Sequence, residues 1–319
     1  MSDLSLLAID ILNKGQNTIT IPSPQSQKQI DIVAEVSHTE ENKAQKHIPN
    51  IEIKLPEFSQ NKSTINRNLR AFLPSNKPKP VSGSQLYYQR LAAIKNGKIY
   101  TRLPVDSYYS FWSEAFTQPT YQDWQWLLAK EAKAIAKGQG SNRLAILLGD
   151  SLSLWYPIEG LPSGKIWLNQ SISGDTTEGI LNRLHFIEST RPNKIYVMAG
   201  INDLKQGYSD SSILDNFRLI MQELRQQHPQ AQVIIQSILP TRYSNISNSR
   251  IRYINQEIAA IAREEGATYL DLYSYLSDRE GNLRWELTTD GLHLNYRGYA
   301  MWQLALQQEE FKSPLKSSK

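Results

Sequence analysis

Residues 144–311 alternate between short apolar runs and stretches with the periodicity of amphipathic helices. The apolar runs occupy residues 144–148, 166–168, 194–199, 232–237 and 267–272. Helical spacing of apolar positions appears in residues 177–189, 211–228 and 248–265. A continuous apolar run is typical of a strand that is buried on both faces of a parallel sheet. Strands that alternate with helices therefore predict an open parallel sheet covered by helices on both faces.

The first 142 residues lack this alternation. Residues 1–83 are rich in Ser, Asn, Gln, Lys and Pro, which predicts a largely disordered tail. Residues 84–142 form a basic and aromatic extension with helical patterns at 84–95 and 122–137. Its aromatic residues, from Tyr87 to Trp126, are too dense for a loose linker, so we expect it to pack on or near the following domain or to carry a surface for a protein partner.

Four short motifs occur in a fixed order within residues 144–311. They are Gly149-Asp150-Ser151-Leu152, Ser173-Gly174-Asp175, Gly200-Ile201-Asn202-Asp203 and Asp290-Gly291-Leu292-His293. Each of the first three follows a predicted strand. Because ligands of open α/β sheets bind outside the carboxyl ends of the strands, we expect these motifs to meet at one edge of the sheet.

The four motifs contain every group that acyl transfer requires. Ser151 offers a hydroxyl nucleophile and His293 a base, and Asp290 can orient the imidazole. Gly174 and Asn202 offer N–H donors for an oxyanion, although Asn202 could also serve only as a turn residue. Of the five histidines, only His293 has a carboxylate three positions earlier and a glycine close by, so it is the predicted base.

The four motifs resemble those of the SGNH hydrolases, also called the GDSL esterase/lipase family, over about residues 144–307. The resemblance implies a three-layer α/β/α, flavodoxin-like fold with a five-stranded parallel sheet. It also implies that Ser151 is the nucleophile, that His293 is the base and that Asp290 is its partner. The oxyanion hole would comprise the amides of Ser151 and Gly174 and the side-chain amide of Asn202. Two runs, Leu-His-Leu-Asn at 292–295 and Ser-Ile-Leu-Pro at 237–240, are similar to the acetylhydrolase branch.

The other motif residues have structural interpretations beside the functional one. Asp150 is equally well explained as a helix cap or as a residue that shapes the site. Asp175 is expected to cap the helix that begins near residue 177, and Asp203 to brace the loop after the third motif. Gly174 and Gly200 fit turns that demand a positive φ angle.

Ser151 is followed by Leu152-Ser153 and so departs from the G-x-S-x-G elbow, which predicts a looser strand-to-helix turn. The chain contains no cysteine and no H-E-x-x-H run, and His185 and His228 have no partner at ligand spacing. We therefore expect no metal site and no cofactor.

Charge is unevenly distributed along the chain, whose net charge is +4. Residues 144–311 carry 14 Lys and Arg against 19 Asp and Glu, so the basic excess lies in the flanks, including a basic tail at 312–319. An enzyme acting on nucleic acid would carry its basic stripe around the site, so no nucleic-acid partner is expected.

The first ten residues lack a positive n-region, and no run of 18 apolar residues occurs. Neither a secretory signal nor a transmembrane segment is expected, which leaves a cytoplasmic location as the default. The expected organisation is a tail (1–83), the aromatic extension (84–142), an SGNH hydrolase domain (143–311) and the basic tail (312–319). The oligomeric state is not readable from the sequence.

These patterns predict a serine esterase that hydrolyses a short acyl ester, such as an O-acetyl group on a carbohydrate, through an acyl-enzyme. Alternatives are a lysophospholipase or thioesterase, an acyltransferase that uses the same residues, and a binding module without catalytic activity. Residues in the loops at the strand ends are candidate pocket walls: Trp155, Tyr156, Pro240, Thr241 and Arg242.

Overall fold

The computed structural model describes residues 77–312, and within them a five-stranded sheet forms the centre. Its strands are β1 (Leu144–Gly149), β2 (Ile166–Ser171), β3 (Lys194–Met198), β4 (Gln232–Gln236) and β5 (Thr268–Leu270). All neighbouring pairs are parallel and their order is β2-β1-β3-β4-β5, the flavodoxin-like order. The predicted α/β fold with five parallel strands is confirmed.

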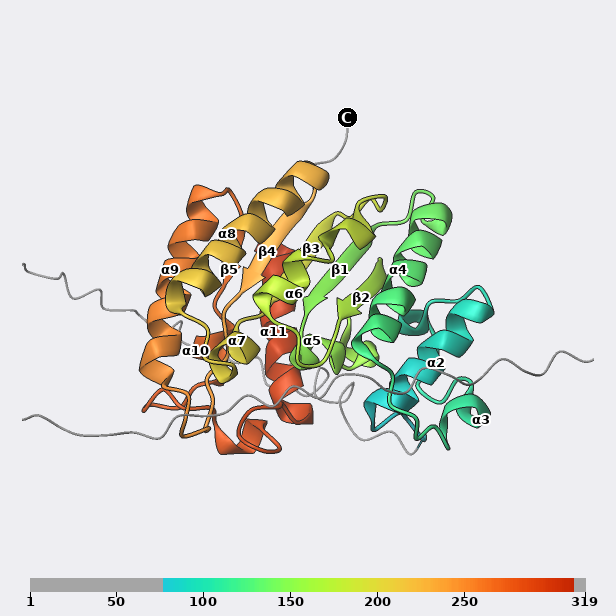
Figure 1. The fold of residues 1–319 in the computed structure, drawn as a ribbon, viewed down its shortest axis with the longest axis horizontal. Helices are drawn as coiled ribbons and strands as arrows, with labels where there is room; N and C mark the ends of the chain where they lie inside the picture. Colours follow the sequence, from blue (N-terminus) through green and yellow to red (C-terminus); the bar gives the residue numbers. More distant parts are fainter. Residues whose placement is uncertain (1–76, 313–319) are drawn as a thin grey trace, which may run out of the picture. The chain divides into compact units, whose positions relative to one another are not determined.

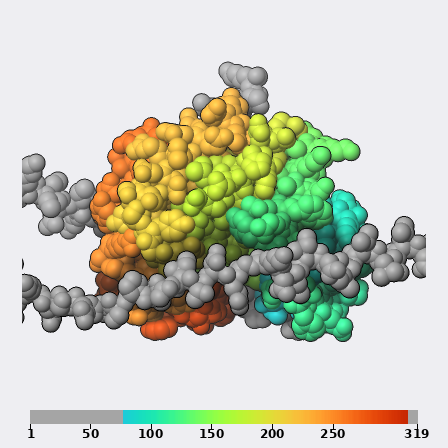
Figure 2. All heavy atoms as spheres, in the orientation of Figure 1, coloured from blue at the N-terminus to red at the C-terminus, as the bar shows by residue number. Residues whose placement is uncertain are grey.

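Helices cover both faces of this sheet. The α-helices are α2 (Gly83–Lys95), α3 (Tyr109–Trp112), α4 (Tyr121–Gly138), α5 (Ser151–Leu154), α6 (Thr177–Leu181), α7 (Ile201–Lys205), α8 (Asp210–Gln227), α9 (Asn248–Glu264), α10 (Leu272–Leu276) and α11 (Tyr296–Lys312). Short 3-10 helices are η1 (Tyr100–Arg102), η2 (Ile158–Gly160), η3 (Leu184–Ile187) and η4 (Trp285–Leu287). Helices α4, α6 and α8 lie in front of the sheet in Figure 1, and α11 lies behind it. The side chains of the front helices close over the strands (Figure 2).

The central strand β1 is apolar along its whole length because the two helical layers exclude water from both faces of the sheet. Every residue of β1, β2 and β3 is buried. Each amphipathic helix turns its apolar stripe toward the sheet, as Phe217 and Met221 of α8 and Ile254 and Ile258 of α9 do, all of them 0% exposed.

The extension before β1 packs against the edge strand β2. The buried guanidinium of Arg90 in α2 donates to the carboxylate of Glu131 in α4. It also donates to the carbonyl oxygen of Asn169 in β2, over 2.7 Å. The hydroxyl of Thr101 donates to the carbonyl oxygen of Trp167 in the same strand. These contacts satisfy acceptors of an otherwise open sheet edge.

The aromatic residues of this extension divide into two groups. Tyr87, Tyr100 and Trp124 are buried in one cluster with Leu154 and Ile172 beside the sheet edge, and Trp112 is buried within the extension. Others are exposed, including Tyr109, Phe111, Phe116 and Trp126. Packing therefore explains the buried group.

The helix predicted at residues 177–189 is interrupted in the structure. It divides into α6 and η3 because Arg183 leaves the helical conformation, with φ −119° and ψ 9°. The predicted cap is also wrong: Thr176 caps α6 by accepting from the amide of Gly179, whereas Asp175 is engaged elsewhere. No helix within residues 77–312 is both long and apolar enough to cross a membrane.

Candidate active site

Ser151 is the first residue of α5 and follows β1 directly. Asp150 caps this short helix, since its Oδ1 accepts from the amide of Leu152 over 2.9 Å. Among the described residues other than glycine, a positive φ occurs at Tyr108 alone. The backbone at Ser151 is thus free of the strain of a nucleophile elbow, in agreement with the looser turn that the sequence predicts.

Ser151, His293 and Asp290 form one hydrogen-bonded chain. The Oγ of Ser151 lies 3.2 Å from Nε2 of His293, and Nδ1 of the same imidazole lies 2.7 Å from Oδ2 of Asp290. The second oxygen of Asp290 accepts from the backbone amides of Leu292 and His293. Partial burial alone would raise the pKa of Asp290, but the hydrogen bonds from His293 and Leu292 outweigh it and hold that pKa below its usual value.

The loop that carries His293 is fixed by its own side chains. The hydroxyl of Thr288 donates to the carbonyl oxygen of His293 over 2.7 Å and accepts from the amide of Gly291. Gly291 has φ +89°, a conformation that L side chains rarely adopt. The short spacing between Asp290 and His293 can therefore close into a direct side-chain contact.

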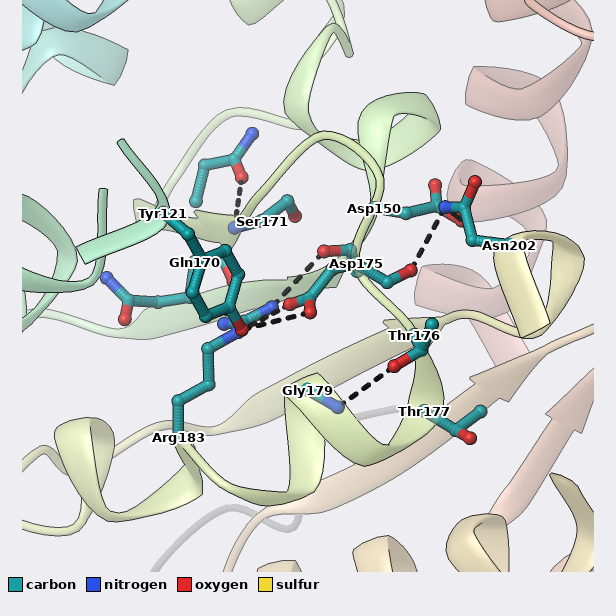
Figure 3. Close-up of polar contacts among 12 residues, drawn as sticks. Tyr121, Asp150, Gln170, Ser171, Asp175, Thr176, Thr177, Gly179, Arg183 and Asn202 are labelled. Atoms are coloured by element: carbon teal, nitrogen blue, oxygen red, sulfur yellow. Dashed lines mark hydrogen bonds and ion pairs between the residues drawn. The ribbon is translucent and has the colours of Figure 1, made fainter. Parts of the chain in front are cut away.

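The loops after β1, β2 and β3 meet at Asn202. Its Nδ2 donates to the carbonyl oxygen of Asp175 over 3.0 Å and lies 3.4 Å from Oδ2 of Asp150 (Figure 3). Gly174, one residue before Asp175, has φ +82°, and the space around its α-carbon is open. Gly200 has φ +104°, and a Cβ there would lie 2.5 Å from Ile238.

Two buried carboxylates surround this meeting point. Burial raises the pKa of Asp150 to about 7, although the hydrogen bond from the Leu152 amide opposes the rise. Asp203 accepts from the amide and the hydroxyl of Thr177 at the start of α6, and burial raises its pKa as well. The side chain of Asp203 thus braces the start of α6, and not the loop after the third motif that the sequence predicts.

Comparison with known proteins identifies the family of the chain. The sequence model of the GDSL-like Lipase/Acylhydrolase family matches residues 106–301, more than half of the chain. The chain belongs to this family. The match begins before α3, so the family domain includes α3 and α4 in addition to the strands and the four motifs.

Two relatives and one solved structure show how far the similarity of this acylhydrolase family member extends. An N-acylneuraminate cytidylyltransferase of Streptococcus agalactiae serotype V is 29% identical over 56% of this chain. The match spans only 42% of that relative's length. Platelet-activating factor acetylhydrolase IB subunit alpha1 of Bos taurus is 26% identical over 57% of this chain and 81% of its own. A Streptococcus pneumonia protein described as a platelet activating factor superposes with TM-score 0.54 at 25% identity, over 59% of this chain and 93% of its own.

The pocket candidates from the sequence lie in two different places. Trp155 and Tyr156 line an apolar cavity of about 110 Å³ between α5 and α2, together with Leu86 and Tyr100. The lining of this cavity does not include Ser151. Trp155 packs against the apolar cluster of the extension, whereas the ring of Tyr156 also packs on Tyr299 and Trp302 of α11.

The second group of candidates holds the loop of His293. Pro240 and Thr241 are buried, and the hydroxyl of Thr241 donates to the carbonyl oxygen of Gly291 over 3.0 Å. The backbone amide of Arg242 donates to the same oxygen over 2.8 Å, and its guanidinium stacks on Trp285. Thr241 and Arg242 therefore act on the position of the imidazole through Gly291.

Sequence reasoning missed Arg183 and Tyr121, which both bind Asp175 (Figure 3). One signal for Arg183 exists in the sequence, because it stands three positions after Ile180 and one before Leu184, on the apolar stripe of the predicted helix. No local pattern marks Tyr121, which lies 54 positions from its partner. Within residues 77–312, no group of three or more acidic or histidine side chains is placed to hold a metal ion.

Proposed function

We propose that this protein is a serine ester hydrolase that cleaves a carboxylic ester through an acyl-enzyme. The observation that carries the proposal is the chain of contacts from Ser151 Oγ to His293 Nε2 and from His293 Nδ1 to Asp290. A nucleophile, a base and an orienting carboxylate within hydrogen-bond reach of one another are what acyl transfer needs. Membership of an acylhydrolase family agrees with it.

In the proposed mechanism, Ser151 Oγ attacks the carbonyl carbon of the ester while its proton passes to Nε2 of His293. The electron pair of the C=O double bond moves onto the oxygen, and the tetrahedral intermediate then expels the alkoxide, which takes the proton from His293. Water repeats the sequence on the acyl-enzyme and releases the acid. Asp290 stabilises the imidazolium and holds its ring in place during both steps.

The oxyanion would be bound by the amides of Ser151 and Gly174 and by the side chain of Asn202. The open space at Gly174 allows the backbone to approach a substrate closely. One hydrogen of Asn202 Nδ2 is donated to the Asp175 carbonyl oxygen over 3.0 Å, which fixes the amide, whereas the contact of Nδ2 with the Asp150 carboxylate is long, at 3.4 Å, and leaves the other hydrogen for the oxyanion. Preorganised donors of this kind are usually the largest contribution to catalysis of acyl transfer.

The substrate proposed is a short acyl ester, such as an O-acetyl group on a carbohydrate. Similarity to a relative named as an acetylhydrolase supports a small acyl group. Hydrolysis of a lysophospholipid or a thioester is the alternative, because the nucleophile and the base would be the same.

Nitrophenyl esters from acetyl to dodecanoyl test this proposal, with the Ser151→Ala variant measured alongside. The expected result is turnover that is highest for acetyl or butyryl and is absent from the variant. A rate that climbs steadily to dodecanoyl would replace the short-ester substrate by a lipid. No turnover of any ester by the unmodified protein would overturn the assignment as an esterase.

A second measurement separates hydrolysis from acyl transfer. Release of acetate from an acetylated sugar is followed by NMR with and without an added alcohol acceptor. Hydrolysis predicts free acetate in both cases. Acyl ester formed in place of acetate, at acceptor concentrations far below that of water, would make the protein an acyltransferase.

A further inference from the structure

Arg183 is a wholly buried arginine that joins the ends of two strands. Its Nε donates to Oδ2 of Asp175 over 2.7 Å, and its two terminal nitrogens donate to the carbonyl oxygens of Gln170, at the end of β2, and of Gly149, the last residue of β1. Figure 3 shows the Arg183 side chain extending from just after α6 toward Asp175. One rigid side chain therefore fixes the starting points of two functional loops.

Asp175, the carboxylate partner of Arg183, is held from three directions. Its Oδ1 accepts from the hydroxyl of Tyr121 over 3.1 Å, and its carbonyl oxygen accepts from Asn202 Nδ2. Helix α6 comes so close that a Cβ on Gly179 would lie 1.9 Å from Oδ1 of Asp175. The carboxylate therefore has almost no freedom to move.

A buried ion pair of this kind is a poor explanation of stability. Removing two charges from water costs as much as or more than their mutual attraction returns, and apolar replacements are often as stable. What the planar guanidinium does provide is several donors in a fixed geometry, which an ammonium group cannot match. The arrangement around Arg183 therefore fits a role in holding the acceptor groups in fixed positions.

We infer that Tyr121, Asp175 and Arg183 form a clamp that positions the oxyanion donors. The inference rests on the proposed function. Each donor is one step from the clamp: the Ser151 amide lies two residues after Gly149, the Gly174 amide precedes Asp175, and the Asn202 amide binds the Asp175 carbonyl oxygen. The three clamp residues do not contact the reacting atoms, so they are positioning residues.

Tyr121 gives the clamp a link to the segment before the sheet. It is the first residue of α4, in the aromatic extension, and its hydroxyl reaches a loop that follows β2. Burial, together with the neighbouring Asp175, raises the pKa of Tyr121 to about 12, so the phenol keeps the proton that it donates. The extension thereby acts on the chemistry of the site through one hydroxyl.

Three single variants test the clamp: Tyr121→Phe, Asp175→Asn and Arg183→Lys. Phenylalanine removes one donor from a side chain that is 38% exposed, which leaves the core intact. In Asp175→Asn, the side chain has only one oxygen to accept from both Tyr121 and Arg183. In Arg183→Lys, a single ammonium group cannot reach the three acceptors that the guanidinium binds. We expect kcat to fall roughly 10-fold for Tyr121→Phe and about 100-fold for the other two, with KM changed less than about threefold.

The readout is kcat for each active site, with sites counted by the burst of a fluorophosphonate probe. A merely structural role would lower the number of sites and the melting temperature but leave kcat for each site unchanged. Clamp variants whose kcat for each labelled site stays within twofold of the unmodified protein would overturn the inference. Tyr121→Phe decides the matter if the two buried variants fail to fold.

Matched controls exist for both kinds of substitution. Tyr208→Phe removes another tyrosine–carboxylate contact, with Glu178 on α6, and Arg90→Lys weakens a second buried ion pair that also binds a β2 carbonyl. Both should keep kcat within twofold, although Arg90→Lys should lower the melting temperature. Ser151→Ala measured alongside keeps the two proposals separate. An active Ser151→Ala refutes the serine esterase, whereas an inactive one with unaltered clamp variants refutes the clamp alone.

Discussion

Ser151 Oγ lies 3.2 Å from His293 Nε2 although 142 positions separate the two residues in the chain. The contact forms because Ser151 begins α5 at the end of β1, while the loop before α11 brings His293 to the same edge of the sheet. Thr241 and Arg242, in the segment that follows β4, hold that loop through the carbonyl oxygen of Gly291. The geometry of this single contact depends on several elements of the sheet.

Replacing Ser151 by Ala is expected to abolish ester turnover without unfolding the protein. The hydroxyl lies at a helix start, so its loss leaves no cavity in the core. Ser153→Ala is a matched control on the same short helix, because Ser153 is buried and its Oγ has no hydrogen-bond partner. Turnover of nitrophenyl acetate and labelling by a fluorophosphonate probe measure both variants. Residual activity above a few per cent in Ser151→Ala would point to another nucleophile.

Asn202→Ala should lower kcat on the order of 100- to 1000-fold with little change in KM, because the lost donor acts mainly in the transition state. Steady-state kinetics with a short-chain ester measure the two constants separately. An effect confined to KM would instead mean that Asn202 binds the ground-state substrate.

Asp290→Asn should lower kcat by several orders of magnitude, because the amide no longer holds the imidazole in the required tautomer. The asparagine keeps one oxygen for the backbone amides of Leu292 and His293, so the loop should retain its shape. Circular dichroism checks the fold, and steady-state assays give the rate. A loss smaller than about tenfold would contradict the orienting role of this carboxylate.

The buried Asp150 predicts a pH dependence of stability. Its pKa in the folded state, about 7, lies above the ordinary value of 3.8, so between these values the folded protein binds a proton that the unfolded chain has lost. The contribution of Asp150 is full below the lower value and is lost as pH rises through the higher one. The melting temperature of Asp150→Asn relative to the unmodified protein should therefore rise between pH 5 and pH 8.

Asp123→Asn is the control for this measurement. Hydrogen bonds from Thr120 hold the pKa of Asp123 below 3.8, so its titration is complete before pH 5. Its melting temperature relative to the unmodified protein should be flat between pH 5 and pH 8. A flat difference for Asp150→Asn as well would show that its carboxylate is ionised across the whole interval.

Much of the fold follows from the sequence, because burial on both faces imposes a local pattern. A strand buried on both faces of the central sheet is mostly apolar, so residues 144–148 and 194–199 are recognisable without any partner. Helices α8 and α9 begin and end within one residue of the periodic segments that predict them. The four motifs are also local, since each combines a strand end with a short turn.

Tertiary structure alone decided what joins these motifs. The interruption of the helix at Arg183 cannot be read from periodicity, because the arginine is turned inward by acceptors on β1, β2 and Asp175. Asp175 looks like a helix cap in sequence, yet Thr176 takes that role while the carboxylate binds Arg183 and Tyr121. A local pattern records the burial and backbone angles of a segment. It does not record which distant donor reaches a carboxylate, because that depends on how the sheet and its helices pack.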